Sequence, residues 1–268
     1  MTSDLIRILR TLGRCLQVAG LFVEASGELL LTNPKSRHDR AAWLHRFCAR
    51  ALRRMGISVR VHGPFPHRGA LITNHLSYLD ILVLASLHPC VFVSKREVAN
   101  LPIVGWMTTR SGTVYVERGH GGSALKAGAA MHAAANDGLP VVFFPEGTTN
   151  PADQLLKFHS GLLGQALVEQ MPVTPGYLRY TLTEDNGPGV TSASHIAWGP
   201  QPMLRHILRF LALRGVHADV FLADQPIAFS SRAAHRKIAA TEARDAVAAL
   251  APHPSASLFP IPAQQTVS

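Results

Sequence analysis

The sequence predicts an α/β fold in which helices flank a mostly parallel sheet, preceded by N-terminal amphipathic membrane-associating helices. From Gly56 onward, short apolar runs alternate with helical stretches, a pattern typical of parallel sheets covered on both faces. Before Gly56 the chain is helical, basic and one-sided in its apolar residues. With 268 residues and 47% hydrophobic content the chain can bury a large core, which excludes a disordered or fibrous protein.

The first 31 residues predict a helix that lies in a membrane interface, because apolar residues share one side and arginines flank them. The longest uncharged stretch, residues 15–23, is about half of the roughly 20 residues that cross a bilayer, so we expect no spanning helix. We also expect no secretory signal, since a clean apolar core and cleavage site are missing. The apolar set is Leu5, Ile8, Leu9, Leu12 and Leu16, and the basic set is Arg7, Arg10 and Arg14.

Residues 37–57 repeat this pattern, with Trp43 as an aromatic anchor among arginines that can snorkel. An ordinary basic helix packed on its own domain would show the same periodicity. The two helices together favour membrane association. The other apolar positions are Leu44, Phe47, Ala51, Leu52 and Met55, and the arginines are Arg37, Arg40, Arg46, Arg50, Arg53 and Arg54.

The rest of the chain alternates strands and helices, with Gly, Ser and Pro between them. The helix expected at 202–215 carries an apolar stripe that core packing explains best, with membrane contact as the minority interpretation. We therefore predict amphipathic N-terminal helices over 1–56, one α/β domain over 57–251 and a proline-rich flexible tail over 252–268. The expected strands cover 57–63, 69–73, 90–95, 112–118, 139–144, 171–180, 194–199 and 217–223, and the other expected helices cover 77–87, 123–137, 161–170 and 230–250.

The charge balance indicates an anionic partner. A net charge of +9 and a pI near 10.1 suit nucleic acid, acidic lipid or a phosphorylated substrate. Nucleic acid is disfavoured because the arginines concentrate on the N-terminal helices and aromatic content is only 7%. Cys15, Cys48 and Cys90 lie far apart, which predicts free thiols and no metal site.

His75 and Asp80 form the candidate catalytic pair. In a continuous helix, residues five positions apart point about 140° away from each other, so both side chains cannot be helical and also meet. They can meet if His75 lies in a turn and Asp80 in the first turns of the following helix. Asn74 is a good turn residue, so the sequence permits this arrangement. Alternatively, Asp80 could have only a structural role near a helix start.

If the pair is formed, His75 would take a proton from a hydroxyl while Asp80 fixes the tautomer and stabilises the imidazolium. No GxSxG motif supplies a protein nucleophile, and "FHSGL" around Ser160 lacks the first glycine. We therefore expect the nucleophile on the substrate, where it could attack a thioester directly. A non-catalytic membrane scaffold of the same fold is the alternative, and it would make His75 dispensable.

Four ordered sequence blocks carry a family resemblance. "NHLSYLD" resembles the NHxxxxD motif of the glycerolipid acyltransferases typified by bacterial lysophosphatidate acyltransferase. "GTVYVERG", "VVFFPEGTTN" and "MPVTPGYLRY" resemble the family's second, third and fourth blocks. The likeness covers roughly residues 60–180, and four blocks in order are far more specific than HxxxxD alone.

The resemblance implies an O-acyltransferase with His75 as general base and Asp80 as the residue that orients it. Arg118 would bind the acceptor's phosphate, and the "PEGTT" turn offers backbone amides to an oxyanion. Taken singly, Arg118 could be a surface residue and Glu146 a partner of an arginine. The implied substrate-binding residues are Asn74, Arg118, Glu146, Gly147, Thr148, Thr149 and Lys157.

One departure concerns the acceptor. Many lysophosphatidate enzymes have EGTR in the third block, whereas this chain has Thr149 after "EGT". Loss of a guanidinium weakens the expectation of a phosphomonoester head group, although Lys157 could supply the charge. We expect acylation of 1-acylglycerol-3-phosphate to phosphatidic acid, with lyso-ornithine lipid or another lysophospholipid as the alternative acceptor.

The remaining expectations follow from this chemistry. The acyl donor would be acyl-CoA or acyl-carrier protein, bound as a substrate, and no cofactor or metal is expected. An anionic membrane surface would hold the basic helices, which places the protein on the cytoplasmic face of the inner membrane.

Overall fold

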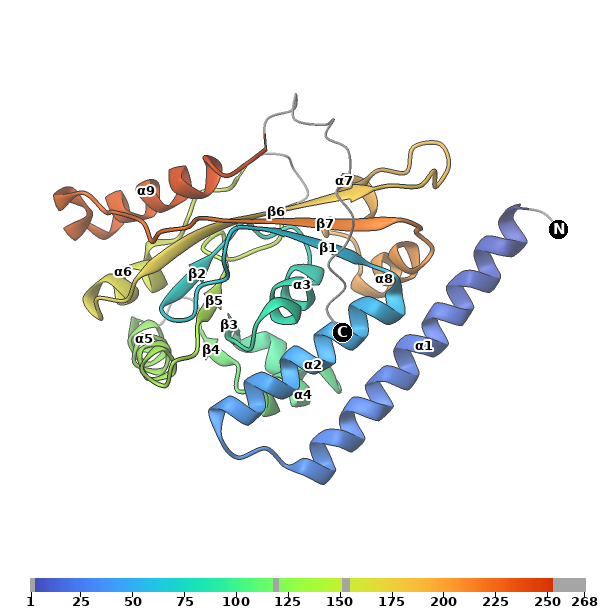
Figure 1. The fold of residues 1–268 in the computed structure, drawn as a ribbon, viewed down its shortest axis with the longest axis horizontal. Helices are drawn as coiled ribbons and strands as arrows, with labels where there is room; N and C mark the ends of the chain where they lie inside the picture. The colour runs from blue at the N-terminus through green and yellow to red at the C-terminus, as the bar shows by residue number, and fades with distance from the viewer. Residues whose placement is uncertain (1–2, 118–120, 151–154, 253–268) are drawn as a thin grey trace.

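The computed structural model describes residues 3–117, 121–150 and 155–252 (Figure 1). Arg118 and nearly all of the proposed tail at 252–268 lie outside these residues. Helices cover both faces of a mostly parallel sheet, which confirms the expected fold class. The predicted domain boundaries stay a prediction.

The described strands form one sheet in the order β1-β7-β6-β2-β5-β3-β4. All neighbours pair in parallel except β6 and β7, which are antiparallel. The short central strand β2 is buried on both faces, as expected inside an α/β sheet. The strands are β1 (Ser58–His62), β2 (Ala70–Ile72), β3 (Val91–Lys95), β4 (Val114–Val116), β5 (Val141–Phe143), β6 (Val173–Leu182) and β7 (Val216–Leu222).

The helices divide between two hydrophobic clusters, one on each face. Side chains alternate along a strand, so Leu71 of β2 joins one cluster while Ala70 and Ile72 join the other. The first cluster includes α1 (Ser3–Thr32), α2 (Arg37–Met55), α3 (Leu79–Leu87), α4 (Val104–Arg110) and α8 (Met203–Leu211). The second includes α5 (Gly121–Asn136), α6 (Ser160–Val168) and α9 (Arg236–Ala248).

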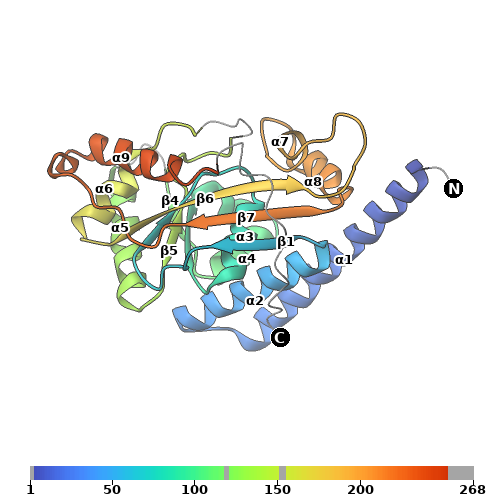
Figure 2. The ribbon, with the colours of Figure 1, turned by 45° about the horizontal axis from the view of Figure 1, so that its top comes forward.

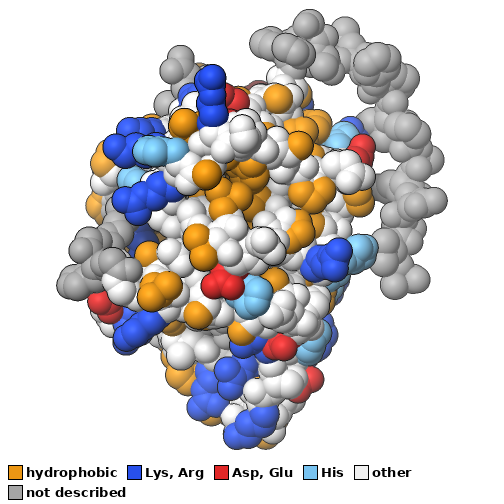
Figure 3. All heavy atoms as spheres, turned by 90° about the vertical axis from the view of Figure 1, so that its left-hand side faces the viewer, with side chains coloured by type: hydrophobic (Ala, Val, Ile, Leu, Met, Phe, Trp, Pro, Cys, Tyr) orange, Lys and Arg blue, Asp and Glu red, His pale blue; other side chains and the backbone are white. Residues whose placement is uncertain are grey.

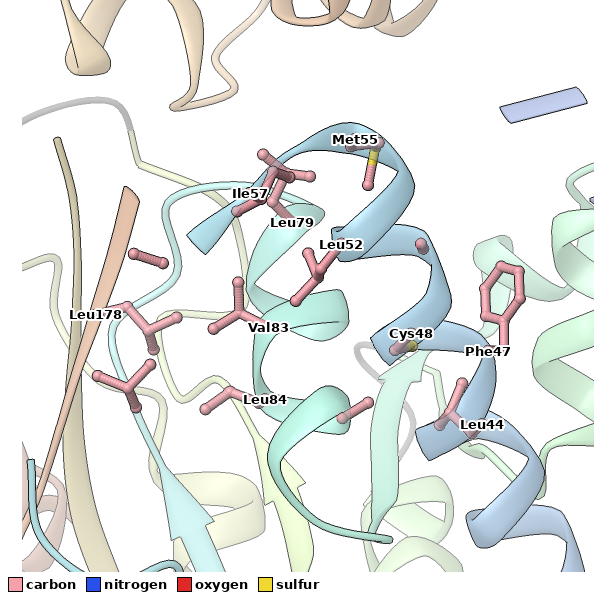
Figure 4. Close-up of a cluster of buried hydrophobic side chains, with 14 of the residues drawn as sticks. Leu44, Phe47, Cys48, Leu52, Met55, Ile57, Leu79, Val83, Leu84 and Leu178 are labelled. Atoms are coloured by element: carbon pink, nitrogen blue, oxygen red, sulfur yellow. The ribbon is translucent and has the colours of Figure 1, made fainter. Parts of the chain in front are cut away.

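The face of α2 that was expected on the membrane is instead inside the protein. Trp43 is only 1% exposed, and Leu52 is buried in the same cluster as Val83 of α3 and Leu178 of β6 (Figure 4). The sequence pattern could not decide this, because packing on α3 and packing on lipid require the same apolar stripe. The expectation that Trp43 anchors α2 in lipid is therefore wrong, while membrane association of the N-terminal helices stays a prediction.

The apolar side of α1, in contrast, stays open. The five predicted leucine and isoleucine positions are exposed, with Leu16 at 75%. Figure 2 shows α1 beside α2 on one side of the sheet, with its N-terminal end extending away from the body. Leu5–Thr32 is long and apolar enough to cross a membrane by length and composition. This differs from the expectation based on the uncharged stretch at 15–23 alone, which is too short to span a bilayer. Contact with a membrane stays a prediction.

The charges of α1 are fixed to the protein. Glu28 accepts hydrogen bonds from Arg46, at 3.0 Å, and Arg50, at 2.5 Å, on α2. Arg10 donates to the Ala212 carbonyl oxygen at 3.3 Å, and Arg14 donates to the Leu211 oxygen at 3.1 Å, both at the end of α8. The outward side of α1 thus keeps apolar groups while several of its charges face α2 and α8.

Two segments differ from the predicted elements. The strand expected at 194–199 is absent, and α7 (Ser192–His195) occupies its start. Thr191 and Ser194 form a capping box, and this local bonding favours a helical turn over extension despite the apolar run after it. The stripe of α8 is also split, because Phe210 and Leu211 are buried while Leu204 is 70% exposed.

Candidate functional site

A cavity of about 1280 Å³ opens between the sheet and its helices. It is lined mainly by apolar side chains from α1 through α9, including Leu21, Trp43, Phe92 and Phe210. This exceeds the usual size of a small-molecule pocket, so a long apolar chain can be accommodated. His75 lies on its wall, which places the candidate pair next to this space.

His75 and Asp80 are in direct contact. His75 lies in the turn after β2, and Asp80 lies in the first turn of α3, as their spacing requires. The distance from His75 Nδ1 to Asp80 Oδ2 is 2.8 Å, and the same oxygen accepts the backbone N–H groups of Leu76, at 2.6 Å, and Ser77, at 2.9 Å. Asp80 is fully buried, so its carboxylate holds the turn and the imidazole together.

Tyr180 also bonds the Asp80 carboxylate. The sequence pattern indicated only that Tyr180 belongs to a strand. Its hydroxyl donates to Asp80 Oδ1 at 2.8 Å. Burial, with the nearby Asp80 carboxylate, raises the pKa of Tyr180 well above its usual value, so the phenol keeps its proton. The His75 ring also stacks on Phe144, with ring centroids 3.9 Å apart. The imidazole is therefore fixed from two sides.

Asn74 and Glu146, expected to bind substrate, instead use their side chains within the protein. Asn74 donates through Nδ2 to the Leu178 oxygen at 2.9 Å and accepts from the Leu178 N–H at 2.7 Å, as a strand residue would. Glu146 Oε1 accepts the His75 N–H at 2.9 Å, and its Oε2 accepts the Leu156 N–H at 3.0 Å. Both residues position His75.

Burial of Glu146 has an electrostatic cost. It raises the pKa of this carboxyl, whereas the two backbone N–H donors and His75 act in the opposite direction. The side chain is 2% exposed, and it lies behind Gly147 rather than on the cavity wall. Glu146 therefore holds the backbone around His75 in place and does not line the cavity.

The turn at 145–150 contributes other residues to the cavity. Gly147 has a φ of +64°, which suits glycine, and its N–H donates to the Phe144 oxygen at 2.9 Å. The Asn150 N–H donates to the His75 oxygen at 2.8 Å, so the Gly147 amide of the "PEGTT" turn and the Asn150 amide after it are both already used. Thr148 and Thr149 line the cavity, and their amides bond no other described residue.

Of the two expected cations, the structure describes only Lys157. Lys157 is exposed and is not among the residues that line the cavity, so no contact carries its proposed role. Arg118 falls in the undescribed segment after Glu117, which itself lines the cavity. Among described residues, Lys95 and Arg236 are the lysine and arginine side chains on the wall. No group of three metal-ligating side chains occurs in the described ranges.

Comparison with known proteins places this geometry in a family. The family model described as "Acyltransferase" matches residues 58–179. The lyso-ornithine lipid O-acyltransferase of Pseudomonas aeruginosa is 34% identical over 67% of this chain and 66% of its own length. That of Rhodobacter capsulatus is 30% identical over 69% of this chain and 67% of its own. The 1-acyl-sn-glycerol-3-phosphate acyltransferase of Neisseria gonorrhoeae is 31% identical over 55% of this chain and 58% of its own.

The matched region thus spans about two thirds of the lyso-ornithine relatives and less of the third. A solved structure, the 1-acyl-sn-glycerophosphate (LPA) acyltransferase of Thermotoga maritima, shares the fold with a TM-score of 0.63 at 20% identity, over 93% of this chain and 98% of that one. The family model covers three of the four blocks entirely and all but the last residue of the fourth, and it includes both His75 and Asp80. The chain therefore belongs to the acyltransferase family, whose named relatives are O-acyltransferases of lysolipids.

Proposed function

We propose that this protein transfers a fatty acyl chain from a thioester donor to the free hydroxyl of a lysolipid. The observation that carries the proposal is the 2.8 Å contact between His75 Nδ1 and the buried Asp80 carboxylate on the wall of a large apolar cavity. This contact places the proton on Nδ1 and directs the basic Nε2 lone pair to a substrate. The cavity holds the acyl chain.

In the proposed reaction, His75 Nε2 accepts the proton of the lysolipid hydroxyl as its oxygen attacks the thioester carbonyl carbon. A C–O bond forms, and the carbonyl oxygen becomes an oxyanion. Collapse of this intermediate breaks the C–S bond, and the imidazolium returns its proton to the leaving sulfur. Asp80 stabilises the imidazolium throughout, so the enzyme regains its starting state.

The oxyanion needs donors that the protein itself leaves unused. The backbone amides of Thr148 and Thr149 meet this condition within the described residues, whereas those of Gly147 and Asn150 do not. We assign oxyanion stabilisation to these two threonine amides, because a preorganised donor acts where charge develops in the transition state.

The acceptor head group is the finer part of the proposal. Thr149 replaces the arginine of many lysophosphatidate enzymes, and the lyso-ornithine lipid relatives match more of this chain than the 1-acyl-sn-glycerol-3-phosphate relative does. Both observations favour lyso-ornithine lipid. 1-Acylglycerol-3-phosphate, which gives phosphatidic acid, stays a candidate because the four blocks match its enzymes as well.

The donor and the location complete the proposal. Acyl-CoA and acyl-carrier protein both carry phosphates that the basic chain attracts, and both are cytoplasmic. The open apolar side of α1 would then lie in the cytoplasmic leaflet of the inner membrane, where the lysolipid is also found. The basic residues of the N-terminal helices would favour anionic lipid.

A head-group screen tests the proposal. Purified full-length protein in mixed micelles is given radiolabelled oleoyl-CoA with lyso-ornithine lipid, lysophosphatidate or lysophosphatidylcholine. We expect transfer to at least one acceptor, a loss of roughly 10³-fold or more in His75→Ala, and little change in His132→Ala, a histidine outside the cavity. Retained transfer in His75→Ala would sink the mechanism. Absence of transfer to every acceptor in wild type would instead favour a non-catalytic scaffold.

A further inference from the structure

Arg236 is a charged residue in a position where the pattern of its helix calls for an apolar one. It is the first residue of α9, and the buried stripe of that helix continues through Ala240, Ala243 and Val247. Residues four, seven and eleven positions apart share a helix face. The side chain therefore starts on the same face as this stripe, although Arg236 itself is exposed, and it lies outside all four sequence blocks.

The facing helix α6 presents a glycine to this side chain. A Cβ added at Gly164 of α6 would lie 3.5 Å from Arg236 Cβ and 3.9 Å from its Cδ, which is ordinary van der Waals contact. The aliphatic stem of Arg236 therefore packs beside Gly164, and Arg236 lines the cavity together with His159 and Ser160. The Arg236 side chain makes no hydrogen bond or ion pair with another residue that the structure describes.

The helix that carries Arg236 is fastened to the third block. Arg244 of α9 donates to the carbonyl oxygens of Leu155, at 3.0 Å, and Leu156, at 3.2 Å. The Leu156 N–H in turn donates to Glu146, which also holds the His75 backbone. A charge on α9 is thus held at a fixed place relative to the 145–150 turn, where Thr149 leaves the acceptor side without a guanidinium.

The surrounding charge favours an anion. Figure 3 shows hydrophobic side chains gathered at the centre of the face on which α5, α6 and α9 lie, with Lys and Arg side chains around them. Among the described lining residues, Lys95 and Arg236 are cationic and Glu117 is the acidic one. A guanidinium offers a planar pair of donors that fits phosphate or carboxylate.

We propose that Arg236 is a specificity-determining residue that binds the anionic group of the lysolipid head group. The inference rests on the proposed function and deepens it. The shared chemistry is an oxyanion with two equivalent acceptors, which a phosphomonoester and the carboxylate of lyso-ornithine lipid both provide. Arg236 supplies, from the C-terminal helix, the charge that Thr149 does not.

The test compares Arg236→Gln with Lys237→Gln, an adjacent loss of the same charge at an exposed residue outside the cavity. The acceptors are lysophosphatidate, lyso-ornithine lipid and the uncharged 1-monoacylglycerol, with oleoyl-CoA as donor. We expect KM for the anionic acceptor that the protein uses to rise about tenfold or more in Arg236→Gln, with little change for the donor, for monoacylglycerol or in Lys237→Gln. The acceptor with the larger rise identifies phosphate or carboxylate as the ligand. Arg236→Lys should recover part of the loss.

A binding measurement separates this inference from the proposed function. Fluorescent lysophosphatidate and fluorescent lyso-ornithine lipid are titrated into wild type and both glutamine variants without donor. Weaker binding of either lipid in Arg236→Gln alone supports the inference even if no acyl transfer is detected, whereas absence of transfer in wild type contradicts the proposed function. Equal binding by all three proteins, or a rise in the KM for the donor alone, would overturn the role of Arg236.

Discussion

The two turns that carry the first and third sequence blocks use their polar groups differently. In the turn at 74–80, the Asn74 amide and the Asp80 carboxylate bond the protein's own backbone or side chains. In the turn at 145–150, Glu146 is used in the same way, but Thr148 and Thr149 face the cavity. Residues of one motif therefore divide into those that hold shape and those that are available to a ligand.

The strongest test of this division is Asp80→Ala. The change removes the acceptor of four donors: the His75 ring, the Leu76 and Ser77 amides and the Tyr180 hydroxyl. We expect kcat to fall roughly 10³–10⁴-fold and the free energy of unfolding to fall by about 3–5 kcal/mol. Steady-state kinetics and denaturant unfolding measure the two effects. A variant with normal stability would show that Asp80 does not hold the turn.

Glu146→Gln asks whether the third-block glutamate holds shape or binds ligand. Gln keeps one carbonyl oxygen but points an NH₂ group at one of the two backbone donors, from His75 or Leu156. An unpaired buried donor costs about 1–3 kcal/mol, so we expect lower stability together with lower kcat. An increase in the acceptor KM with unchanged unfolding would instead place Glu146 among the ligand contacts.

Tyr180→Phe removes one hydrogen bond to Asp80 and leaves the ring in place. We expect a loss of about 1–2 kcal/mol in stability and a several-fold lower kcat, because Asp80 is less well fixed. The KM values should stay the same, since Tyr180 is not among the cavity-lining residues. Unchanged stability and kcat in Tyr180→Phe would argue against a specific role for the Tyr180 hydroxyl.

Thr149→Ala tests a residue of the turn at 145–150 that faces the cavity. Its side chain is partly exposed and faces the cavity, so stability should change by less than about 0.5 kcal/mol. Its amide is unaffected, so kcat should be near that of wild type. Thermal unfolding and kinetics with both anionic acceptors check this. A large loss of stability would remove the distinction between the two turns.

The smallest expected effect is a pH dependence at Glu146. Burial raises its pKa above the ordinary value of 4.5, so the folded state binds more proton than the unfolded state between the two pKa values. The contribution of this group to stability is therefore full below 4.5 and is lost as pH rises through the folded pKa. The difference in unfolding free energy between wild type and Glu146→Gln should decrease over that window. A constant difference would contradict a raised pKa.

Much of this arrangement could be predicted from the sequence. The alternation of strands and helices gave the sheet, and the five-residue spacing required the turn that brings His75 to Asp80. The sequence could not show that the apolar sides of α1 and α2 have different surroundings, because periodicity indicates one apolar side and not what covers it. α2 meets α3, whereas α1 keeps Leu16 open.

Other parts of the site depend on contacts that no local pattern records. Tyr180 lies 100 residues from Asp80 in the sequence, and Arg236 lines the cavity from a helix that follows all four sequence blocks. The prediction of a strand at 194–199 is wrong for a local reason, because the capping box at Thr191 begins a helical turn there. No sequence motif includes Arg236. The signal that could have found it is a charged residue at the start of the otherwise apolar stripe of α9.

The cavity draws its wall from both ends of the described chain, from Val18 on α1 to Arg236 on α9. During synthesis α1 leaves the ribosome early, while Arg236 follows Val18 by roughly 220 residues. At about 5–20 residues per second, the interval between Val18 and Arg236 is roughly 10–45 s. If α1 binds the bilayer as proposed, the nascent chain would reach it well before the cavity is complete, and it would become competent only where its substrate already lies.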